Sequence, residues 1–406
     1  MNLKENFFKY FYFENKIIYL IILLPISLFI GSSINNLFII IIIFTYLFQL
    51  QKKKKFEFNL LFYLIIILYL YLILNSVFLT QTNEGIIRAI GFIRFPLLAF
   101  AIAYYLRLED EKYLKPVLQT WFIIFIIVSI DIIFEFFFGF NSIGNVSNYA
   151  GRLASFSGDE LKIGGYYFGF VLLALWIVNK DYKKYFYLYL IFFLICSLLI
   201  GEKANFLKSL FITSIFLIVT YNQTIIKKLS FLTLFLALSI FFIKSTPSFN
   251  SRFIVHSFNN ISSFNYETIV KSNEHLSHYH TAFEIFKENK LFGIGIKNFR
   301  NLSYDDKFNP FENVNGGSNH PHQIHFEFLS ELGLTGYILL FGILIILISR
   351  GIRQYLNNKD ILSFIGSIFI IATILPIIPS GSFFTTYTAT IFWINVSLIL
   401  RYKKIN

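Results

Sequence analysis

The sequence predicts an all-α polytopic membrane protein with about twelve transmembrane helices and one large outer loop that contains short helices. Charged residues make up only 14% of the 406 residues, and apolar residues make up 56%. Soluble domains carry about 25% charged residues, so this chain has too little polar surface to face water on all sides. The composition excludes a soluble globular enzyme, a secreted disulfide scaffold and a disordered chain.

Apolar runs provide the predicted spans in order along the chain. About 20 apolar residues cross the hydrocarbon core of a bilayer, and shorter runs are tolerated. The runs lie at residues 17–32, 34–50, 58–79, 86–106, 117–139, 164–179, 185–201, 204–221, 229–243, 332–349, 361–379 and 385–400. They predict an N-terminal bundle of about nine spans at 1–243, an outer loop at 244–331 and about three closing spans at 332–406.

Lysine and arginine fix the predicted orientation. With both termini cytoplasmic, most of the 35 basic residues lie in cytoplasmic segments. The short outer turns at 31–36, 80–85 and 380–384 then hold no Lys or Arg, as the positive-inside rule requires. The net charge of +12 therefore reports orientation and argues against a nucleic-acid partner.

All seven histidines fall in the predicted outer loop, which indicates that any chemistry lies at the outer membrane face. His322 precedes an apolar helical pattern, so a neutral imidazole there could accept a proton from an attacking sugar hydroxyl. Two alternatives stay open. The 320–325 segment could be a polar helix start, or His320, His322 and His325 could ligate zinc together with His278 or His280. The single Cys196 lies in an apolar run and can form no intramolecular disulfide.

Two further polar segments lie on the same predicted side. Lys203 interrupts the apolar pattern at 201–206, where it could bind lipid-linked phosphate or where the acid Glu202 could neutralise Lys203 or Lys208. Arg152 lies in the 151–160 loop, and its planar fork suits phosphate oxygens, although surface arginines are common in loops.

Charges inside predicted spans suggest ion pairs at matched depth. Arg94 and Asp131 are predicted to pair, and Arg88 could pair with Glu135 or face lipid phosphates. Residues 292–300 lack the third glycine of a dinucleotide site and predict a turn. Residues 277–289 carry apolar side chains at helical spacing and predict an amphipathic helix that lies on the membrane or caps the site.

The chain resembles the O-antigen ligase and O-antigen polymerase family of bacterial inner-membrane glycosyltransferases. The resemblance is carried by GEKANF at 201–206, FEIFKENKLFGIGIKNF at 283–299 and HPHQIHFEFLSELGLTG at 320–336. It implies transfer of an undecaprenyl-diphosphate-linked glycan to a lipid A core or glycan acceptor at the periplasmic face. It also implies that the reaction needs no metal and no cofactor.

The resemblance assigns roles to individual residues. His322 matches the proposed general base, and Gln323 stands where Asn is usual. Lys203 and His275 fall at or near positions where the family carries arginines that hold the diphosphate.

Other basic residues could replace those arginines. Arg152, Arg252 and Arg300 are candidates, and Arg152 is preferred because its loop is similar to that of polymerase-like members. Arg88 and His320 complete the candidate substrate-binding set.

A multispanning transporter or lipid-glycan flippase is the alternative class. Such proteins show repeated halves, broken helices near the midplane and short outer loops. This sequence has one oversized loop late in the chain and no evident repeat, which favours glycosyl transfer.

Overall fold

The computed structural model describes residues 16–53, 60–80, 82–149, 151–158, 162–255, 266–309 and 317–401. Within these residues every regular element is helical, which confirms the predicted all-α class. The longer helices are α2 (Ile17–Ile30), α3 (Ser32–Lys53), α4 (Leu60–Leu79), α5 (Asn83–Phe92), α6 (Arg94–Glu111), α7 (Leu114–Phe138), α8 (Ile163–Asp181), α9 (Phe186–Leu199), α10 (Lys203–Thr220), α11 (Ile225–Ser245), α15 (Glu274–Glu288), α17 (Ile324–Asn358), α18 (Ile361–Thr373) and α19 (Thr386–Arg401). The short elements are α12 (Pro247–Asn250), α14 (Tyr266–Ser272), α16 (Phe299–Leu302), the 3₁₀ turns η1 (Ser155–Ser157) and η2 (Lys183–Tyr185), and the π-helical turn η3 (Ser251–Val255).

Eight helical segments in the described part of the chain are long and apolar enough to cross a membrane. They are α3, α4, the α5–α6 pair, α7, α8, α10, α11 and α17, and α2 and α18 are shorter apolar helices. Within the described residues each predicted run overlaps a helix, but α18 ends at Thr373, so the predicted span at 361–379 is too long. The number of crossings stays a prediction.

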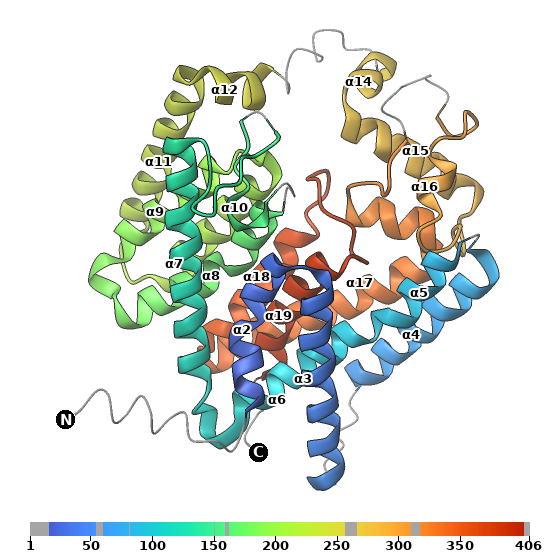
Figure 1. Ribbon diagram of the computed structural model, residues 1–406, viewed down its shortest axis with the longest axis horizontal. Coiled ribbons are helices and arrows are strands. Elements are labelled where there is room, and N and C mark those ends of the chain that lie inside the picture. Colours follow the sequence, from blue (N-terminus) through green and yellow to red (C-terminus); the bar gives the residue numbers. More distant parts are fainter. Residues whose placement is uncertain are drawn as a thin grey trace.

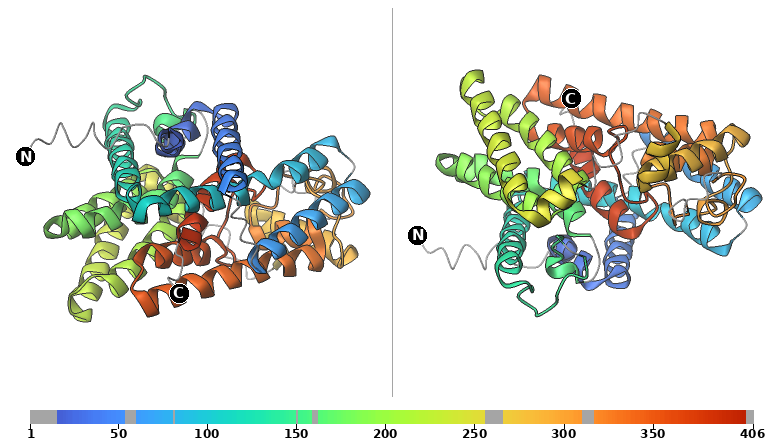
Figure 2. Two further views of the ribbon diagram at one scale, coloured as in Figure 1. Left: turned by 90° about the horizontal axis from the view of Figure 1, so that it is seen from below. Right: turned by 90° about the horizontal axis from the view of Figure 1, so that it is seen from above.

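Helices α18 and α19 lie near the centre of the molecule, between two groups of helices (Figures 1 and 2). Helices α9 to α12 lie on one side, and α4, α5 and α14 to α16 lie on the other (Figure 1). Helix α19 packs against α6 and α18 and is buried along almost its whole length. Most of its side chains are apolar, as is expected of a helix in such a central place.

Helix α17 is kinked at Gly333, which has φ 64° and ψ −170°. The freed backbone groups are paired, because Leu334 N donates to Lys290 O at 2.8 Å and Thr335 N donates to Leu291 O at 3.1 Å. Side chains would not fit here, since a Cβ on Gly333 would lie 2.5 Å from the Leu291 carbonyl carbon. The predicted 292–300 turn therefore follows a segment that docks on the kink of α17.

The predicted amphipathic helix at 277–289 is confirmed as α15. It begins earlier than predicted, after Asn273, whose side chain accepts a hydrogen bond from Leu276 N at 3.2 Å. Its buried face carries His278, Ala282 and Ile285 and packs against α17.

The predicted ion pairs of Asp131 and Glu135 are wrong. Asp131 accepts hydrogen bonds from Ser142 N at 2.8 Å and from Ser155 Oγ at 2.6 Å. Glu135 accepts hydrogen bonds from the backbone N–H groups of Ala154 and Ser155. Both acids therefore bind the connection that follows α7, because its free N–H groups satisfy them locally.

Candidate active site

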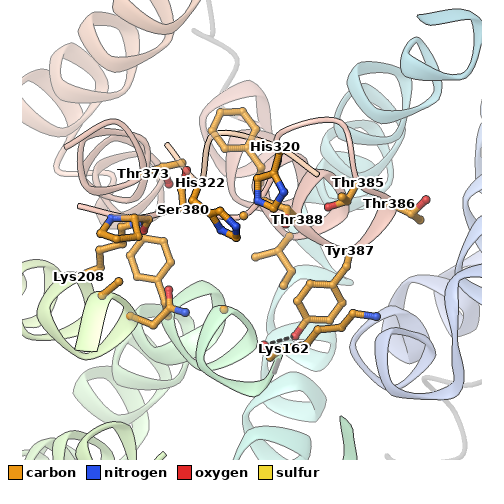
Figure 3. A pocket seen from close by; sticks show the side chains of 18 of the residues that line it. Lys162, Lys208, His320, His322, Thr373, Ser380, Thr385, Thr386, Tyr387 and Thr388 are labelled. Carbon is orange, nitrogen blue, oxygen red and sulfur yellow. Dashed lines mark hydrogen bonds between the residues drawn. The ribbon is translucent and has the colours of Figure 1, made fainter. Parts of the chain in front are cut away.

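A cavity of about 1580 Å³ lies among α3, α5, α6, α8, α10, α18 and α19 and the segments before α17 and α19 (Figure 3). Its wall is mainly apolar but carries two acids, Glu84 and Glu202. The basic side chains that line it are Arg88, Arg94, Arg152, Lys162, Lys203 and Lys208. Positive charge therefore exceeds negative charge at this wall, as an anionic ligand requires.

The structure brings most of the sequence-predicted site residues to this one cavity. His322, His320, His275, Lys203, Arg152 and Arg88 all line it. Arg252 and Arg300 are not among the lining residues. Residues 152, 203, 275 and 322 come from four separate segments, so tertiary packing creates the cluster.

His322 lies at the cavity wall in a left-handed backbone conformation, with φ 58°. Its carbonyl accepts a hydrogen bond from Ser380 N at 2.7 Å, and its Nε2 lies 3.2 Å from Ser318 Oγ. Burial and then the neighbouring His320 lower the pKa of His322 to about 2. The ring is therefore a neutral imidazole at neutral pH and can accept a proton.

Three further imidazole rings surround His322. The ring centroids of His320, His278 and His275 lie 4.0, 5.2 and 5.3 Å from that of His322. Burial and nearby cations lower the pKa of His320 to about 3, and burial together with His278 lowers the pKa of His275. His275, His320 and His322 are thus neutral at neutral pH, and they add polar surface without adding charge.

The remaining histidine of the 320–325 segment has a structural role. His325 Nδ1 lies 3.0 Å from Tyr337 Oη, and its Nε2 lies 2.8 Å from Ile374 O. Gln323 caps α17, because its side chain accepts hydrogen bonds from the N–H groups of His325 and Phe326. Across the described residues, no group of three His, Cys, Asp or Glu side chains is arranged to hold a metal ion.

Lys203 and Arg152 meet because two tight turns touch. Gly201 has φ 76°, and a Cβ there would lie 2.1 Å from Gly151 O. Leu153 N also donates to Ile200 O at 3.1 Å. The Arg152 Nε is buried and has no hydrogen-bond partner in the described part of the chain. A cavity ligand is the natural partner for this donor.

Arg252 stabilises the contact between the Gly151 and Gly201 turns. Its Nε donates to Gly201 O at 2.6 Å, which fixes the turn that carries Lys203. Burial and then the nearby Arg152 lower the pKa of Arg252 to about 10. Its contact with the backbone makes it a support for the cation cluster.

Glu202 is the acid of the cluster. Its Oε2 accepts a hydrogen bond from Asn205 Nδ2 at 2.5 Å, and its charge interacts with Arg152 and Arg252. Burial raises the pKa of Glu202 above its usual value, and these polar partners oppose the shift. Its charge also interacts with Lys208, as one alternative from the sequence anticipated.

Arg88 and Arg300 share one acid from α5. Arg300 pairs with the Glu84 carboxylate, and Arg88 Nη2 lies 3.5 Å from the same group. Glu84 therefore compensates part of both positive charges and ties α5 to the end of α16.

The sequence predicts the loop that holds His322 only as the end of the 361–379 span and the start of the 380–384 outer turn. This strap, residues 377–383, receives hydrogen bonds from Tyr279 Oη to Ile377 O at 3.2 Å and from Lys208 Nζ to Pro379 O at 2.8 Å. Lys297 Nζ donates to Ser382 Oγ at 2.9 Å. The Ser382 hydroxyl and the Phe383 N–H donate to the Glu327 carboxylate. The strap has no charged residue, so its sequence gives no sign that it contacts His322.

Other missed residues also line the cavity. Lys162 lies over the Tyr387 ring at 5.6 Å, and Tyr387 Oη donates to Lys162 O at 2.8 Å (Figure 3). Lys208 was considered only as a partner of Glu202, and Arg94 only as a partner of Asp131. Lys208 and Arg94 each lie in an apolar stretch, where a charge indicates a functional site but does not identify the residues packed around it.

Residues 188–341 of the chain match the sequence profile of the O-antigen ligase family. A comparison with curated proteins finds no significant match. The matched residues include Lys203, His275, His320 and His322, all of which line the cavity. This match to part of the chain supports the O-antigen ligase and polymerase assignment that the sequence resemblance predicted.

Proposed function

We propose that the protein transfers a glycan from an undecaprenyl-diphosphate donor to a lipid or glycan acceptor, with His322 as general base. The convergence of His322 with Lys203 and Arg152 at one cavity carries this proposal. Membrane-length helices suit a lipid-linked substrate, and excess positive charge at the wall suits its diphosphate. The membrane is the bacterial inner membrane, both termini are cytoplasmic, and the cavity opens to the periplasmic face.

In the proposed reaction, an acceptor hydroxyl attacks the anomeric carbon of the donor sugar. A new glycosidic C–O bond forms as the bond between that carbon and the diphosphate oxygen breaks. The bonding electrons leave with the diphosphate, and the hydroxyl proton passes to the His322 imidazole. The negative charge of the departing diphosphate stabilises the imidazolium that forms.

Lys203 and Arg152 bind the diphosphate in this scheme. The Arg152 Nε is a buried donor that faces no protein acceptor within the described residues. Cations aimed at a leaving group lower the barrier most where water is excluded. Because side chains supply this charge, the reaction should need no metal, and EDTA should leave transfer intact.

The deciding experiment is His322→Ala in the purified, membrane-inserted protein. We expect loss of about 10²–10⁴-fold in the rate of transfer, because general-base catalysis contributes about that much. Donor binding should persist, since Lys203 and Arg152 are unchanged.

His325→Gln provides a matched control, because this imidazole bonds to Tyr337 and Ile374 away from the cavity. Any loss of rate there should track loss of folded protein. Full transfer by folded His322→Ala would overturn the assignment of the base.

A further inference from the structure

Arg94 is a cation at the cavity wall whose contacts are all neutral. It lies at the break between α5 and α6 and lines the cavity. Its Nε donates to Asn36 Oδ1 at 3.2 Å, its Nη2 donates to Thr386 Oγ1 at 3.3 Å, and its Nη1 donates to Gly91 O. No carboxylate forms an ion pair with it in the part of the chain that the structure describes.

An uncompensated cation within a membrane-length segment is costly and marks a functional site. The guanidinium is also held rigidly, because its Cζ lies 4.2 Å above the Phe95 ring. A guanidinium has five N–H groups, and the three contacts above leave one on each terminal nitrogen. Two donors on adjacent nitrogens match the oxygens of a phosphate group.

This cation is separate from the Lys203 and Arg152 pair. Arg94 contacts Asn36 on α3 and Thr386 on α19, whereas Lys203 and Arg152 lie where the turns at Gly151 and Gly201 touch. The cavity joins the two regions and, at about 1580 Å³, exceeds the roughly 300–1,000 Å³ of a typical small-molecule site. It therefore has room for two anionic head groups with His322 at the same wall.

We propose that Arg94, Asn36 and Thr386 form a second anion subsite, which binds a phosphate group of the acceptor. This inference rests on the proposed function, because the donor diphosphate is assigned to Lys203 and Arg152. The acceptor is then a saccharide on a phosphorylated lipid, and its phosphate is anchored at Arg94 while its hydroxyl reaches His322. A polyprenyl diphosphate or a phosphorylated glucosamine lipid would both supply this chemistry.

Binding stoichiometry tests the second subsite without requiring turnover. The probe is farnesyl diphosphate, added to the full chain in nanodiscs and followed by native mass spectrometry. The wild-type protein should bind two equivalents. Arg94→Gln should weaken one of them by about 10–100-fold, because a hydrogen bond to a charged group contributes about that much. Lys203→Ala combined with Arg152→Ala should weaken the other.

Arg353→Gln is the matched control, because Arg353 is exposed near the end of α17 and is not among the cavity-lining residues. It should keep both equivalents. If Arg94→Gln fails to fold, Thr386→Val removes one hydroxyl of the subsite at constant shape and should also weaken the second equivalent. A single equivalent in the wild type, or two undiminished equivalents in folded Arg94→Gln and Thr386→Val, would overturn the proposal.

Competition then identifies the source of the phosphate. Displacement of the second equivalent by lipid A indicates a phosphorylated glucosamine lipid, and its displacement only by a longer polyprenyl diphosphate indicates a lipid-linked glycan. Resistance to both competitors would contradict the acceptor assignment. The number of bound equivalents is measured without turnover, so a failure of the proposed glycan transfer and a failure of the second subsite give different results.

Discussion

At the scale of single residues, burial keeps the proposed base His322 neutral and lowers its basicity when no anion is bound beside it. His322 is surrounded by three other imidazoles. A proton on any one of these rings would make protonation of the others less favourable. His275, His320 and His322 therefore stay neutral until an anion enters the cavity. A diphosphate beside it would favour the protonated ring and so increase its basicity when the donor is bound.

This neutrality predicts loss of stability in acid. The pKa values of His320 and His322 are about 3 and about 2 in the folded protein, against 6.5 for the ordinary side chain. Between these values the unfolded chain binds protons that the folded chain does not, so the free energy of unfolding falls as the pH drops below about 6.5. Thermal unfolding of the wild type between pH 7.5 and 5 should show this slope, and His320→Gln should reduce it. Equal slopes would show that these rings titrate normally in the fold.

Lys203 offers a second residue-scale prediction. Lys203→Ala should weaken donor binding as well as turnover, because the lost charge acts on the diphosphate in both the ground state and the transition state. Lys203→Arg should retain most activity, since it keeps the charge and restores the residue that the family resemblance expects. Donor titrations of both variants by initial rate measure the two effects. Equal damage by Ala and Arg would indicate a steric role for this position.

At the scale of elements, the strap at 377–383 links His322 to buried charge. Glu327 accepts hydrogen bonds from the Ser382 hydroxyl and the Phe383 N–H, and the Ser380 N–H binds the His322 carbonyl. The carboxylate on α17 thereby holds the loop that fixes the backbone of the proposed base.

Glu327→Gln should loosen this strap while keeping side-chain volume. We expect the kcat to fall by up to about 10²-fold, because small displacements of a catalytic group carry such costs. The KM for the donor should change little, since the diphosphate ligands lie on other segments. Glu288→Gln, at an exposed ion pair with Lys307, is the control. A selective rise in the donor KM would contradict the positioning role.

At the scale of the whole molecule, the orientation in the membrane decides which side the cavity serves. The wild type helps the test, because its one cysteine, Cys196, is buried and should not react. Ser318→Cys should be labelled by a membrane-impermeant maleimide from the periplasmic side, and Asn357→Cys should be labelled only from the cytoplasm. Cytoplasmic labelling of Ser318→Cys would refute the predicted topology and the periplasmic chemistry with it.

The sequence by itself determined the class of the protein and the position of its helices. A bilayer requires long apolar runs, so composition and hydropathy alone locate α2 to α11 and α17 to α19. Short motifs predicted the resemblance to O-antigen ligases that the match at residues 188–341 supports, and the histidine segment before α17 pointed to His322. Each of these features is formed by residues that are close together in the sequence, so the sequence alone is enough to find it.

Only the tertiary structure decided which charges meet. Asp131 and Glu135 accept hydrogen bonds from the connection between α7 and α8, which leaves Arg94 with neutral partners and Arg88 with Glu84. The strap reaches His322 from nearly sixty residues further along the chain. Hydropathy carries no information on such pairings, because they depend on which helices are neighbours and which face each helix presents to them. The cavity and its two cationic regions therefore emerge only when the helices are assembled.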